Sequence, residues 1–234
     1  SMGVYLGNDS NRPRSDECIG CSPNENYARE LLQLFSIGVV QLNPDGSVVR
    51  DAQGRPKESY TQRDVSELAR ALTGWRNAPM AMPLPDTIYF NAFQPMVPET
   101  WVGAHDRGAK RVLGTGFPAG QSAPQDLDMA IGMLMAHPNI APFVSLRLIQ
   151  HLVTSNPTPQ YLGRVAAVFR NNGQGVAGDM KAVIRAILLD PEARLGDTPG
   201  ADRPGFGLIR EPVLFHLAAF RGLGCKTAPR TPDG

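Results

Sequence analysis

The chain has 234 residues, enough for one large domain or two small ones, and folding of such a chain buries roughly 70% of its unfolded surface. Lysine and arginine number 23 against 22 aspartate and glutamate, and the formal charge of +1 argues against a nucleic-acid-binding surface. No apolar run approaches the about 18 residues of a membrane-spanning helix, and the N-terminus lacks a signal-peptide pattern. We therefore expect a soluble protein with no nucleic-acid partner and no membrane span.

The first 21 residues predict an irregular segment that carries two of the three cysteines. Because Ser1 precedes Met2, either Ser1 is a cloning remnant or the chain begins inside a longer precursor. Cys18 and Cys21 form a C-x-x-C motif, whereas Cys225 stands alone near the other end. The motif lacks the histidine of a haem attachment site and the second C-x-x-C of a zinc site. A local disulfide, free thiols and half of a metal site all remain open.

A first helix is predicted to begin at Ser22-Pro23-Asn24-Glu25. Serine at the N-cap, proline at the first helical position and glutamate three residues after the cap together form a capping box. The apolar spacing of the helix predicts a buried face made of Tyr27, Leu31, Leu34, Phe35 and Gly38.

A small β-hairpin and a second helix are predicted next. The turn sequence Asn43-Pro44-Asp45-Gly46 lies between two short β-prone runs, at 39–42 and 47–50, which is typical of a hairpin. Thr61 is the expected N-cap of the second helix, with Asp64 three residues later and a stop at Gly74-Trp75. Its predicted inner stripe consists of Val65, Leu68, Ala69 and Leu72.

Residues 76–122 predict a long loop, because they are rich in proline and glycine and show no sustained period. We expect this loop to be ordered, since it contains aromatic residues that favour packing: Tyr89, Phe90, Phe93 and Trp101.

From residue 122 onward the sequence predicts a helical bundle up to about residue 223. A first helix follows Ser122, with the apolar residues Leu127, Ala130, Ile131 and Leu134, and a second follows the His137-Pro138 break. Thr158-Pro159 opens a third helix, and Asp179 caps a fourth that Asp190-Pro191 ends. Glu211-Pro212 opens the last, which runs through Val213, Leu217 and Phe220. The predicted fold is a single irregular all-α domain, 1–234, of about seven helices with one small β-hairpin, a long ordered loop and a tail at 224–234.

Several segments carry a family resemblance. The stretch PNENYARELLQLFSIG at 23–38, YTQRDV at 60–65 and ARALTGW at 69–75 resemble the bacterial family called domain of unknown function 1800. The segment 2–11, the pair His105-Asp106 and the sequence VLG at 112–114 agree in the same order. The resemblance covers the chain from Met2 to about Leu223, although the insert at 43–57 and the C-x-x-C motif are not family-wide features.

The resemblance implies a location and partners but no reaction. The family's domain is considerably longer and has an amino-terminal tryptophan-histidine-rich motif, so this chain is expected to be a carboxy-terminal portion that pairs with a missing amino-terminal region. The family is predicted to be exported, which implies a periplasmic or extracellular location. Its genes often lie beside those of an exported sulfatase-like family, which implies a partner protein. No activity is established for the family, so the cofactor stays unknown.

The first candidate site residues are Glu25, Arg29 and Glu30, which crowd two carboxylates and a cation onto one apolar helix. Glu25 and Arg29 are also an ordinary i, i+4 pair, and Glu25 suits the capping box, so a structural role competes with a functional one.

The second candidates are His105 and Asp106 in the long loop, because a histidine next to a carboxylate can act as general base or metal ligand. For a metal site the candidate ligands are His105, Asp106 and Glu25, in the absence of any recognisable metal or nucleophile motif. Among the other histidines, His151 and His216 are expected in the core or at its edge, and His137 at a cap.

Two functions follow as hypotheses. The first is part of an exported enzyme whose site combines Glu25, Arg29 and Glu30 with His105 and Asp106. The alternative is a non-catalytic scaffold or binding module for an exported partner, with contacts from Tyr89, Phe90 and Trp101.

Overall fold

The computed structural model of the chain describes residues 2–14, 22–79, 94–197, 205–209 and 211–225. The N-terminal helices are α1 (Met2–Tyr5), the 3-10 helix η1 (Asn8–Ser10), α2 (Glu25–Gln33) and α3 (Gln62–Ala71). The later helices are α4 (Ala123–Ala136), α5 (Ile140–Leu152), α6 (Pro159–Arg170), α7 (Met180–Leu189), α8 (Pro191–Arg194), the 3-10 helix η2 (Leu195–Asp197) and α9 (Pro212–Gly222). The prediction of a mainly helical fold is confirmed, with nine α-helices in the described residues where about seven were expected.

Two small antiparallel sheets interrupt the helices. Strands β1 (Trp75–Arg76) and β2 (Val97–Pro98) pair with each other, as do β3 (Lys110–Val112) and β4 (Thr115–Phe117). The small hairpin predicted around the turn at 43–46 is confirmed, since Leu42 forms an antiparallel bridge with Val48 and the Val49 amide donates to the Gln41 carbonyl. Its pairing consists of isolated bridges, and two more lie beside it: Val40 with Glu58 and Arg50 with Pro56. Strand β1 begins shortly after α3, and the other three strands lie within the segment expected to be a loop.

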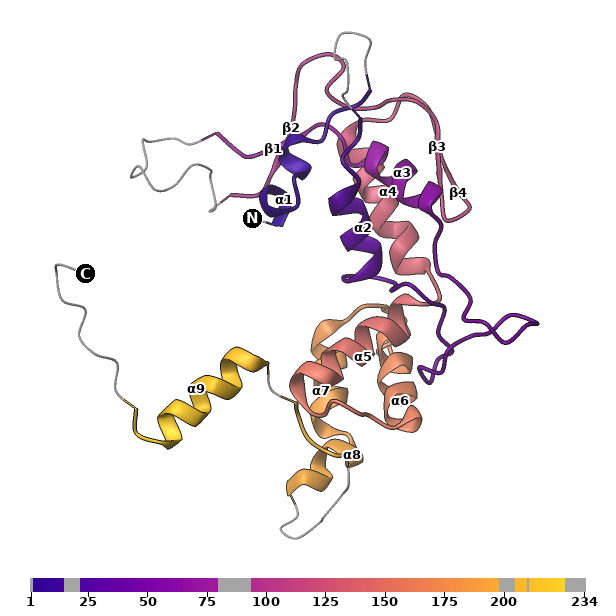
Figure 1. The fold of residues 1–234 in the computed structure, drawn as a ribbon. Helices are drawn as coiled ribbons and strands as arrows, with labels where there is room; N and C mark the ends of the chain where they lie inside the picture. Colours follow the sequence, from indigo (N-terminus) through magenta and orange to yellow (C-terminus); the bar gives the residue numbers. More distant parts are fainter. Residues whose placement is uncertain (1, 15–21, 80–93, 198–204, 210, 226–234) are drawn as a thin grey trace, which may run out of the picture.

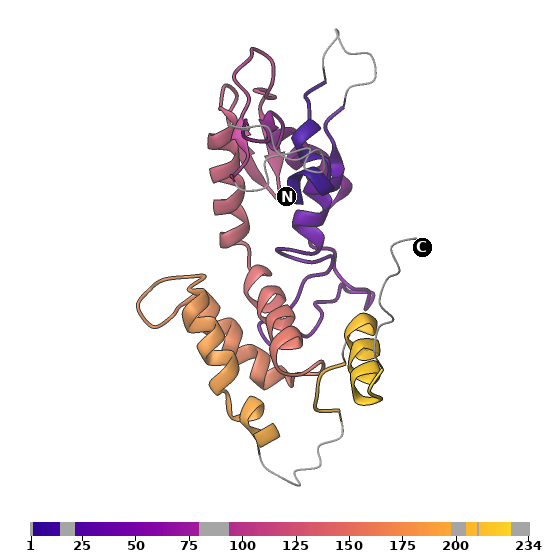
Figure 2. The ribbon, with the colours of Figure 1, turned by 90° about the vertical axis from the view of Figure 1, so that its left-hand side faces the viewer.

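Two groups of helices follow one another along the molecule. Helices α2, α3 and α4 pack together with β3, and α5, α6 and α7 pack below them (Figure 1). Figure 2 shows that α4 leads directly into α5, and the two helices are bent by 80° at their junction. Within the described part of the chain no single helix has the length and hydropathy to cross a membrane. Among the described helices, only α4 and α5 taken together, with the bend between them, reach that length and hydropathy.

One contiguous hydrophobic cluster runs through both groups. Its largest fully buried members include Leu32 of α2, Leu68 of α3, Ile149 of α5 and Tyr161 of α6. The two groups approach each other closely at Gly38, whose φ is +69° and where a Cβ atom would lie 2.4 Å from the Phe143 ring. Only glycine allows this approach of the chain after α2 to helix α5.

Most of the predicted helix starts are confirmed by cap hydrogen bonds. Thr61 and Asp64 form a capping box at α3, and Thr158 and Asp179 each accept a backbone hydrogen bond at the start of α6 and α7. Asp190 follows the last residue of α7, as predicted for the end of that helix, and it also caps the short helix α8. The first cap is different from the prediction. Asn24, and not Ser22, is the N-cap of α2, and its side chain accepts from the amide of Asn26.

The inner stripe predicted for α3 is confirmed, since Val65, Leu68, Ala69 and Leu72 are at most 1% exposed. The buried face of α2 differs from the prediction. Its buried residues are Ala28 and Leu32, whereas Leu34 and Phe35, which follow the helix, are exposed. Apolar residues of two later helices are exposed as well: Ile131 in α4 and Val213, Leu217 and Phe220 in α9. His151 and His216 are exposed and not in the core, whereas His137 Nδ1 accepts from the Asn139 amide as a cap should.

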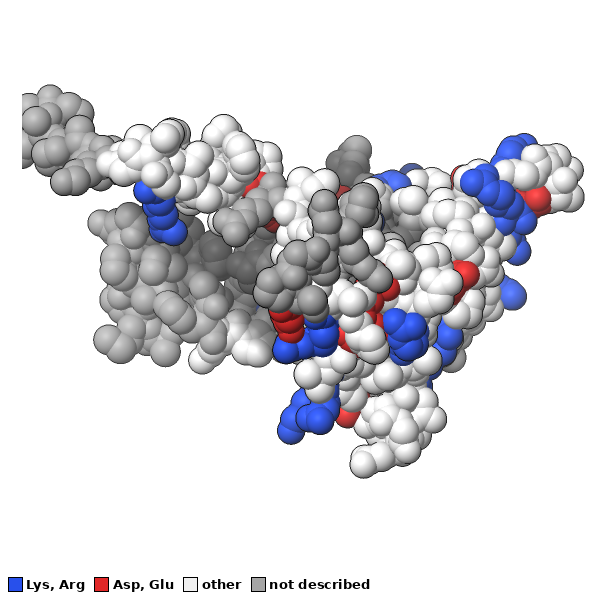
Figure 3. Space-filling view, turned by 90° about the horizontal axis from the view of Figure 1, so that it is seen from below, with Lys and Arg blue, Asp and Glu red and all other residues white. Residues whose placement is uncertain are grey.

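Charged side chains are dispersed over the surface. Seen from below, lysine and arginine form separate small groups, with aspartate and glutamate among them (Figure 3). This face therefore presents no continuous field of one sign.

Candidate functional site

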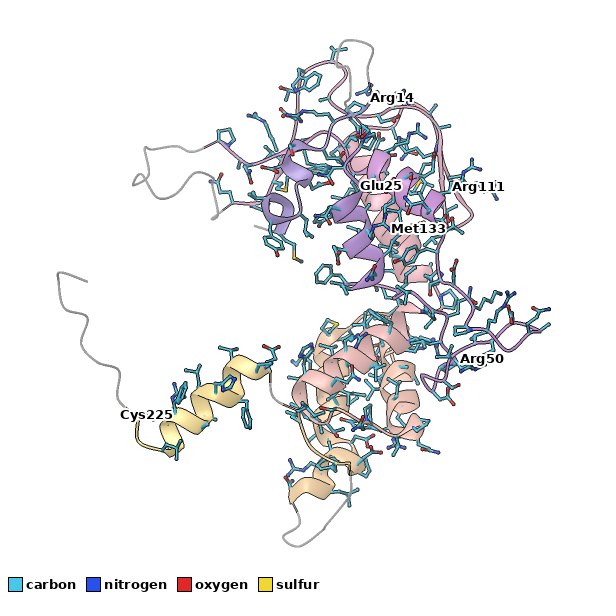
Figure 4. The ribbon with its side chains drawn as sticks, in the orientation of Figure 1. Arg14, Glu25, Arg50, Arg111, Met133 and Cys225 are labelled. Carbon is cyan, nitrogen blue, oxygen red and sulfur yellow. The ribbon has the colours of Figure 1, made fainter. Side chains whose placement is uncertain are left out.

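The candidate residues of α2 connect this helix to α3. Ser66 and Gln62 of α3 donate to the Glu25 carboxylate, and Arg29 pairs with the same carboxylate at 3.1 Å as the predicted i, i+4 pair. The hydrogen bond from Ser66, followed by those from Gln62 and Arg29, outweighs partial burial and lowers the pKa of Glu25. Figure 4 shows Glu25 at the N-terminal end of α2, next to α3. The bonds from Ser66 and Gln62 join α2 to α3, whereas the Glu25–Arg29 pair lies within α2.

Glu30, the third candidate on α2, has no such partner. One of its carboxylate oxygens, Oε2, is buried and accepts no hydrogen bond from the described residues. It lines a separate pocket between α1 and α2.

Asp106 is held by Arg70 of α3 in a two-pronged ion pair. Arg70 Nε lies 2.8 Å from Asp106 Oδ2 and Nη2 lies 3.1 Å from Oδ1, while the Gly108 amide donates to Oδ1. Burial acts to raise the pKa of Asp106, but the hydrogen bonds from Arg70 and Gly108 outweigh it, so the pKa lies below the usual value. Arg70 also pairs with Glu67 at 2.9 Å. The carboxylate of Asp106 thus anchors the long loop to α3.

His105 points inward from the loop. Its Nδ1 lies 2.9 Å from the Thr73 carbonyl oxygen, which can only accept, so Nδ1 carries a hydrogen. Its Nε2 lies 3.1 Å from Oδ2 of Asp126 in the first turn of α4. The approach depends on Gly74, because a Cβ atom there would lie 3.0 Å from both Ala104 O and His105 Cβ.

Lys110 of β3 completes this buried cluster. Its ammonium lies 2.7 Å from Oδ2 of Asp126, and both side chains are fully buried. The same ammonium donates to the carbonyl oxygens of Asp106 and Gly108, which uses all three of its hydrogens. Of the cluster's atoms, Asp126 Oδ1 is buried without a hydrogen-bond partner in the described residues.

The two sets of predicted residues are joined through α3 and not directly. Gln62, Ser66 and Arg70 follow one another at i, i+4 and i+8 on α3, so they share one stripe of that helix. The first two bind Glu25 and the third binds Asp106. Among the hydrogen bonds and ion pairs of the described residues, none links Glu25, Arg29 or Glu30 to His105 or Asp106.

The predicted metal ligands do not converge in the described part of the chain. No group of three or more His, Cys, Asp or Glu side chains there has an arrangement that could hold a metal ion. Cys18 and Cys21 lie outside the described residues, and Cys225 is an exposed free cysteine just past the end of α9 (Figure 4).

A pocket of about 620 Å³ lies beside His105, between the loop at 98–107 and the start of α4. Its lining includes Trp101, Arg107 and Glu99. Glu99 is already paired with Arg12 at 3.1 Å, and the Arg12 guanidinium also lies over the Trp101 ring. Tyr89 and Phe90, the other aromatic residues expected to make contacts, lie outside the described residues.

Sequence reasoning found His105 and Asp106 but missed Lys110 and Asp126. The spacing His-Asp-x-Gly-x-Lys at 105–110 was a usable signal, because a lysine so close to an inward-pointing histidine shares its environment. No local signal could have identified Asp126, since a carboxylate in the first turn of a helix is common for electrostatic reasons alone.

In the cluster of His105, Lys110 and Asp126, the nitrogen atoms are saturated by contacts within the protein, and only Asp126 Oδ1 lacks a partner among the described residues. Both imidazole nitrogens face acceptors inside the protein, and the ammonium has no hydrogen left for a ligand. A general base needs a nitrogen lone pair within reach of its substrate. In this arrangement neither group offers one to the pocket.

The comparisons with known proteins give one match. A family model described as protein of unknown function (DUF1800) matches residues 1–232. No curated protein and no solved structure matches the chain. The match spans nearly the whole chain and includes the α2, α3 and His105 segments described above. The chain therefore belongs to the DUF1800 family of proteins of unknown function.

Proposed function

We propose that this chain is a non-catalytic binding module of an exported bacterial protein, and that it binds an exported sulfatase-like partner through helix α9. The observation that carries the proposal is the state of α9, a helix with apolar residues all round and no buried residue. The saturated contacts of His105 and Lys110 support a non-catalytic role. The location and the kind of partner rest on the family resemblance.

Helix α9 has the composition of a helix that is covered. Between Pro212 and Gly222 its one charged residue is Arg221. Five large apolar side chains of this helix are 45–62% exposed: Val213, Leu214, Phe215, Leu217 and Phe220. In Figure 1 the helix stands beside α5–α8 without packing on them. A helix that is apolar on all sides is normally buried, and a large exposed apolar patch marks an interaction surface.

A groove on one side of α9 gives the partner a defined place. The groove has a volume of about 380 Å³ and lies between α9, residues 208–209 and the end of α5. Leu214, Leu217 and Ala218 supply its apolar wall on α9. Residues 205–209 are fixed to the segment just after α5: Ser155 N donates to Gly207 O at 2.8 Å, and the amides of Gly207 and Ile209 donate to the hydroxyls of Thr154 and Ser155. One wall of the groove is therefore firmly attached to the bundle.

Charges at the two ends of the groove define the chemistry of its occupant. Glu211 and Arg221 both line the groove and are separated by ten residues, which corresponds to about 15 Å along a helix. An amphipathic segment of about three turns fits if it has an apolar face, a basic residue near Glu211 and an acidic residue near Arg221. This pattern is what we expect on the surface of the sulfatase-like partner.

The test measures binding between the full-length protein and the purified sulfatase-like protein encoded beside it. We expect calorimetry to give a dissociation constant in the micromolar range or tighter. Leu217→Glu should weaken binding at least tenfold, because it places a carboxylate in the apolar wall of the groove. Leu188→Glu on α7 is the matched control, since Leu188 and Leu217 are both 45% exposed. The control should bind as the unmodified protein does.

Three outcomes contradict this proposal. The first is the absence of a complex at tens of micromolar, and the second is equal weakening of binding by both variants. The third is dimerisation of the chain that Leu217→Glu abolishes, detected by sedimentation, because a second copy would then be the occupant of the groove. Recovery of the full-length protein in the cytoplasmic fraction would separately contradict the exported location.

A catalytic role is the second candidate, favoured by the pocket beside His105. For catalysis, a ligand entering the pocket must draw His105 Nε2 away from Asp126. His105→Gln and Glu25→Gln in the full-length protein should then leave the fold intact and remove activity or a stoichiometric metal found by elemental analysis. Variants that lose only stability would support the structural role of both residues.

A further inference from the structure

A pocket between α1 and α2 is distinct from the groove at α9. It has a volume of about 540 Å³. Glu30 and Asn26 of α2 provide its polar lining, and the remainder is apolar or aromatic: Met2, Tyr5, Leu6, Leu34 and Phe35. A carboxylate therefore lies in an otherwise apolar pocket.

The Glu30 carboxylate is short of hydrogen-bond donors. Its Oε2 atom is buried and has no hydrogen-bond partner in the described residues. The neighbouring Arg29 does not serve it: adjacent residues of a helix do not face each other, and Arg29 Nη2 donates to Glu25 at 3.1 Å and to Gln62 at 3.0 Å instead. Glu25 on the same helix accepts from three side chains. A buried carboxylate oxygen without a donor is unfavourable, so Glu30 is ready to accept one from a ligand.

The rim of the pocket is apolar and open to solvent. Tyr5 is 86% exposed, and Met2, Leu34 and Phe35 are 47–51% exposed. Methylene groups pack against such side chains while their charged end reaches a counter-ion, and aromatic rings attract cations. A carboxylate ligand would be repelled by the Glu30 carboxylate, and a neutral apolar ligand would leave Oε2 without a hydrogen-bond donor.

We propose that the pocket between α1 and α2 binds an alkylammonium group, with Glu30 as its counter-ion and with Tyr5 and Phe35 against its methylene chain. The lysine side chain of another protein and a free primary amine share this chemistry. The site does not depend on the binding function assigned to α9, because it uses other helices.

The experiment titrates the isotope-labelled full chain with n-butylammonium and follows backbone amide signals. Signals of Glu30, Leu34 and Phe35 should shift and saturate, whereas butyrate and butanol should produce no saturating shift at these residues. Glu30→Gln should weaken binding at least tenfold. Asp128→Asn removes an exposed carboxylate on α4 and should change nothing. A lysine-containing peptide is then compared with its acetyl-lysine form: tighter binding than n-butylammonium identifies a protein side chain, and equal or weaker binding identifies a free amine.

A second variant covers the case in which Glu30→Gln does not fold. Asn26→Lys places an ammonium one helical turn before Glu30 in the same pocket, so it should block n-butylammonium while Glu30 remains. The proposal is overturned if butanol binds as well as n-butylammonium, if the shifts fall on other residues, or if every variant that folds binds as the unmodified chain does.

Discussion

Lys110 of β3 and Asp126 of α4 form an ion pair 2.7 Å long in which both side chains are fully buried. The pair joins the small β3–β4 sheet to the first turn of the longest helix described. His105 adds a third charged or polar group at 3.1 Å from the same carboxylate oxygen. Such a pair is costly to break, because either partner alone is a buried charge without compensation.

Lys110→Met should therefore lower the free energy of unfolding by about 3–5 kcal/mol, since it leaves Asp126 buried without its cation. Chemical denaturation at neutral pH measures the change. The double variant Lys110→Met with Asp126→Leu should be more stable than Lys110→Met alone, because it removes the uncompensated charge. Arg55→Ala breaks an exposed ion pair and is the control, with no measurable change expected. Equal unfolding free energies of Lys110→Met and Arg55→Ala would contradict the stabilising role of the buried pair.

Asp106 should make the protein sensitive to acid. Its pKa in the folded protein lies below the ordinary 3.8, because the hydrogen bonds from Arg70 and Gly108 outweigh burial. A group with a lowered folded pKa stabilises the fold fully above its unfolded pKa, and this contribution is lost as the pH falls through the folded value. Between about pH 5 and pH 1, the unmodified protein should lose more unfolding free energy than Asp106→Asn. Identical pH profiles of the two proteins would show that the Arg70 pair contributes nothing.

Tyr161 should produce the opposite dependence at alkaline pH. Burial, followed by the charges of Asp190 and Glu192, raises its pKa well above the ordinary 10. A raised folded pKa gives stability that is complete below the unfolded pKa and is lost as the pH rises toward the folded value. The unfolding free energy should thus fall above pH 10, and less steeply in Tyr161→Phe. Ultraviolet titration should show one tyrosine that ionises only when the protein unfolds.

At neutral pH the hydroxyl of Tyr161 has a second role. It donates to the Ile187 carbonyl at 2.7 Å, and this carbonyl has no helical partner because residue 191 is proline and lacks an amide hydrogen. Tyr161→Phe should cost about 1–3 kcal/mol of unfolding free energy, since it leaves a buried acceptor without a donor. A loss below the error of the denaturation curve would show that water replaces the hydroxyl.

Asn139 should hold in place the segment 37–42, which leads from α2 into the insert at 43–57. Its side-chain amide donates to the carbonyls of Ile37 and Val40, and its oxygen accepts from the amide of Leu42 at 2.6 Å. Asn139→Asp keeps the shape but turns an acceptor toward the two carbonyls, so it should cost about 1–3 kcal/mol for each group left unsatisfied. Hydrogen exchange of the Leu42 amide should become faster. Asn43→Asp, in the exposed turn that follows this segment, is the control and should leave the exchange rate of the Leu42 amide unchanged.

The sequence by itself determined where most helices begin and end. The caps at Thr61, Thr158 and Asp179 are predicted correctly, because a cap depends on backbone amides within three residues of the capping side chain. The pairing of Glu25 with Arg29 was equally local, since one helical turn separates the two. The exception, Asn24 in place of Ser22, shows that two neighbouring polar residues can compete for one cap.

Only the tertiary structure decided which faces are buried and which charges meet. The apolar residues of α9 predict the helix, yet no residue of that helix is buried, because burial requires another element to pack on it. Asp126 was not recognised as the partner of His105 and Lys110, since its carboxylate reaches them only when α4 packs beside β3. Strand pairing is equally non-local: Trp75 pairs with Pro98 across 21 intervening residues. Caps are fixed by the nearest amides in the chain, whereas buried ion pairs and sheets exist only after distant segments have been brought together.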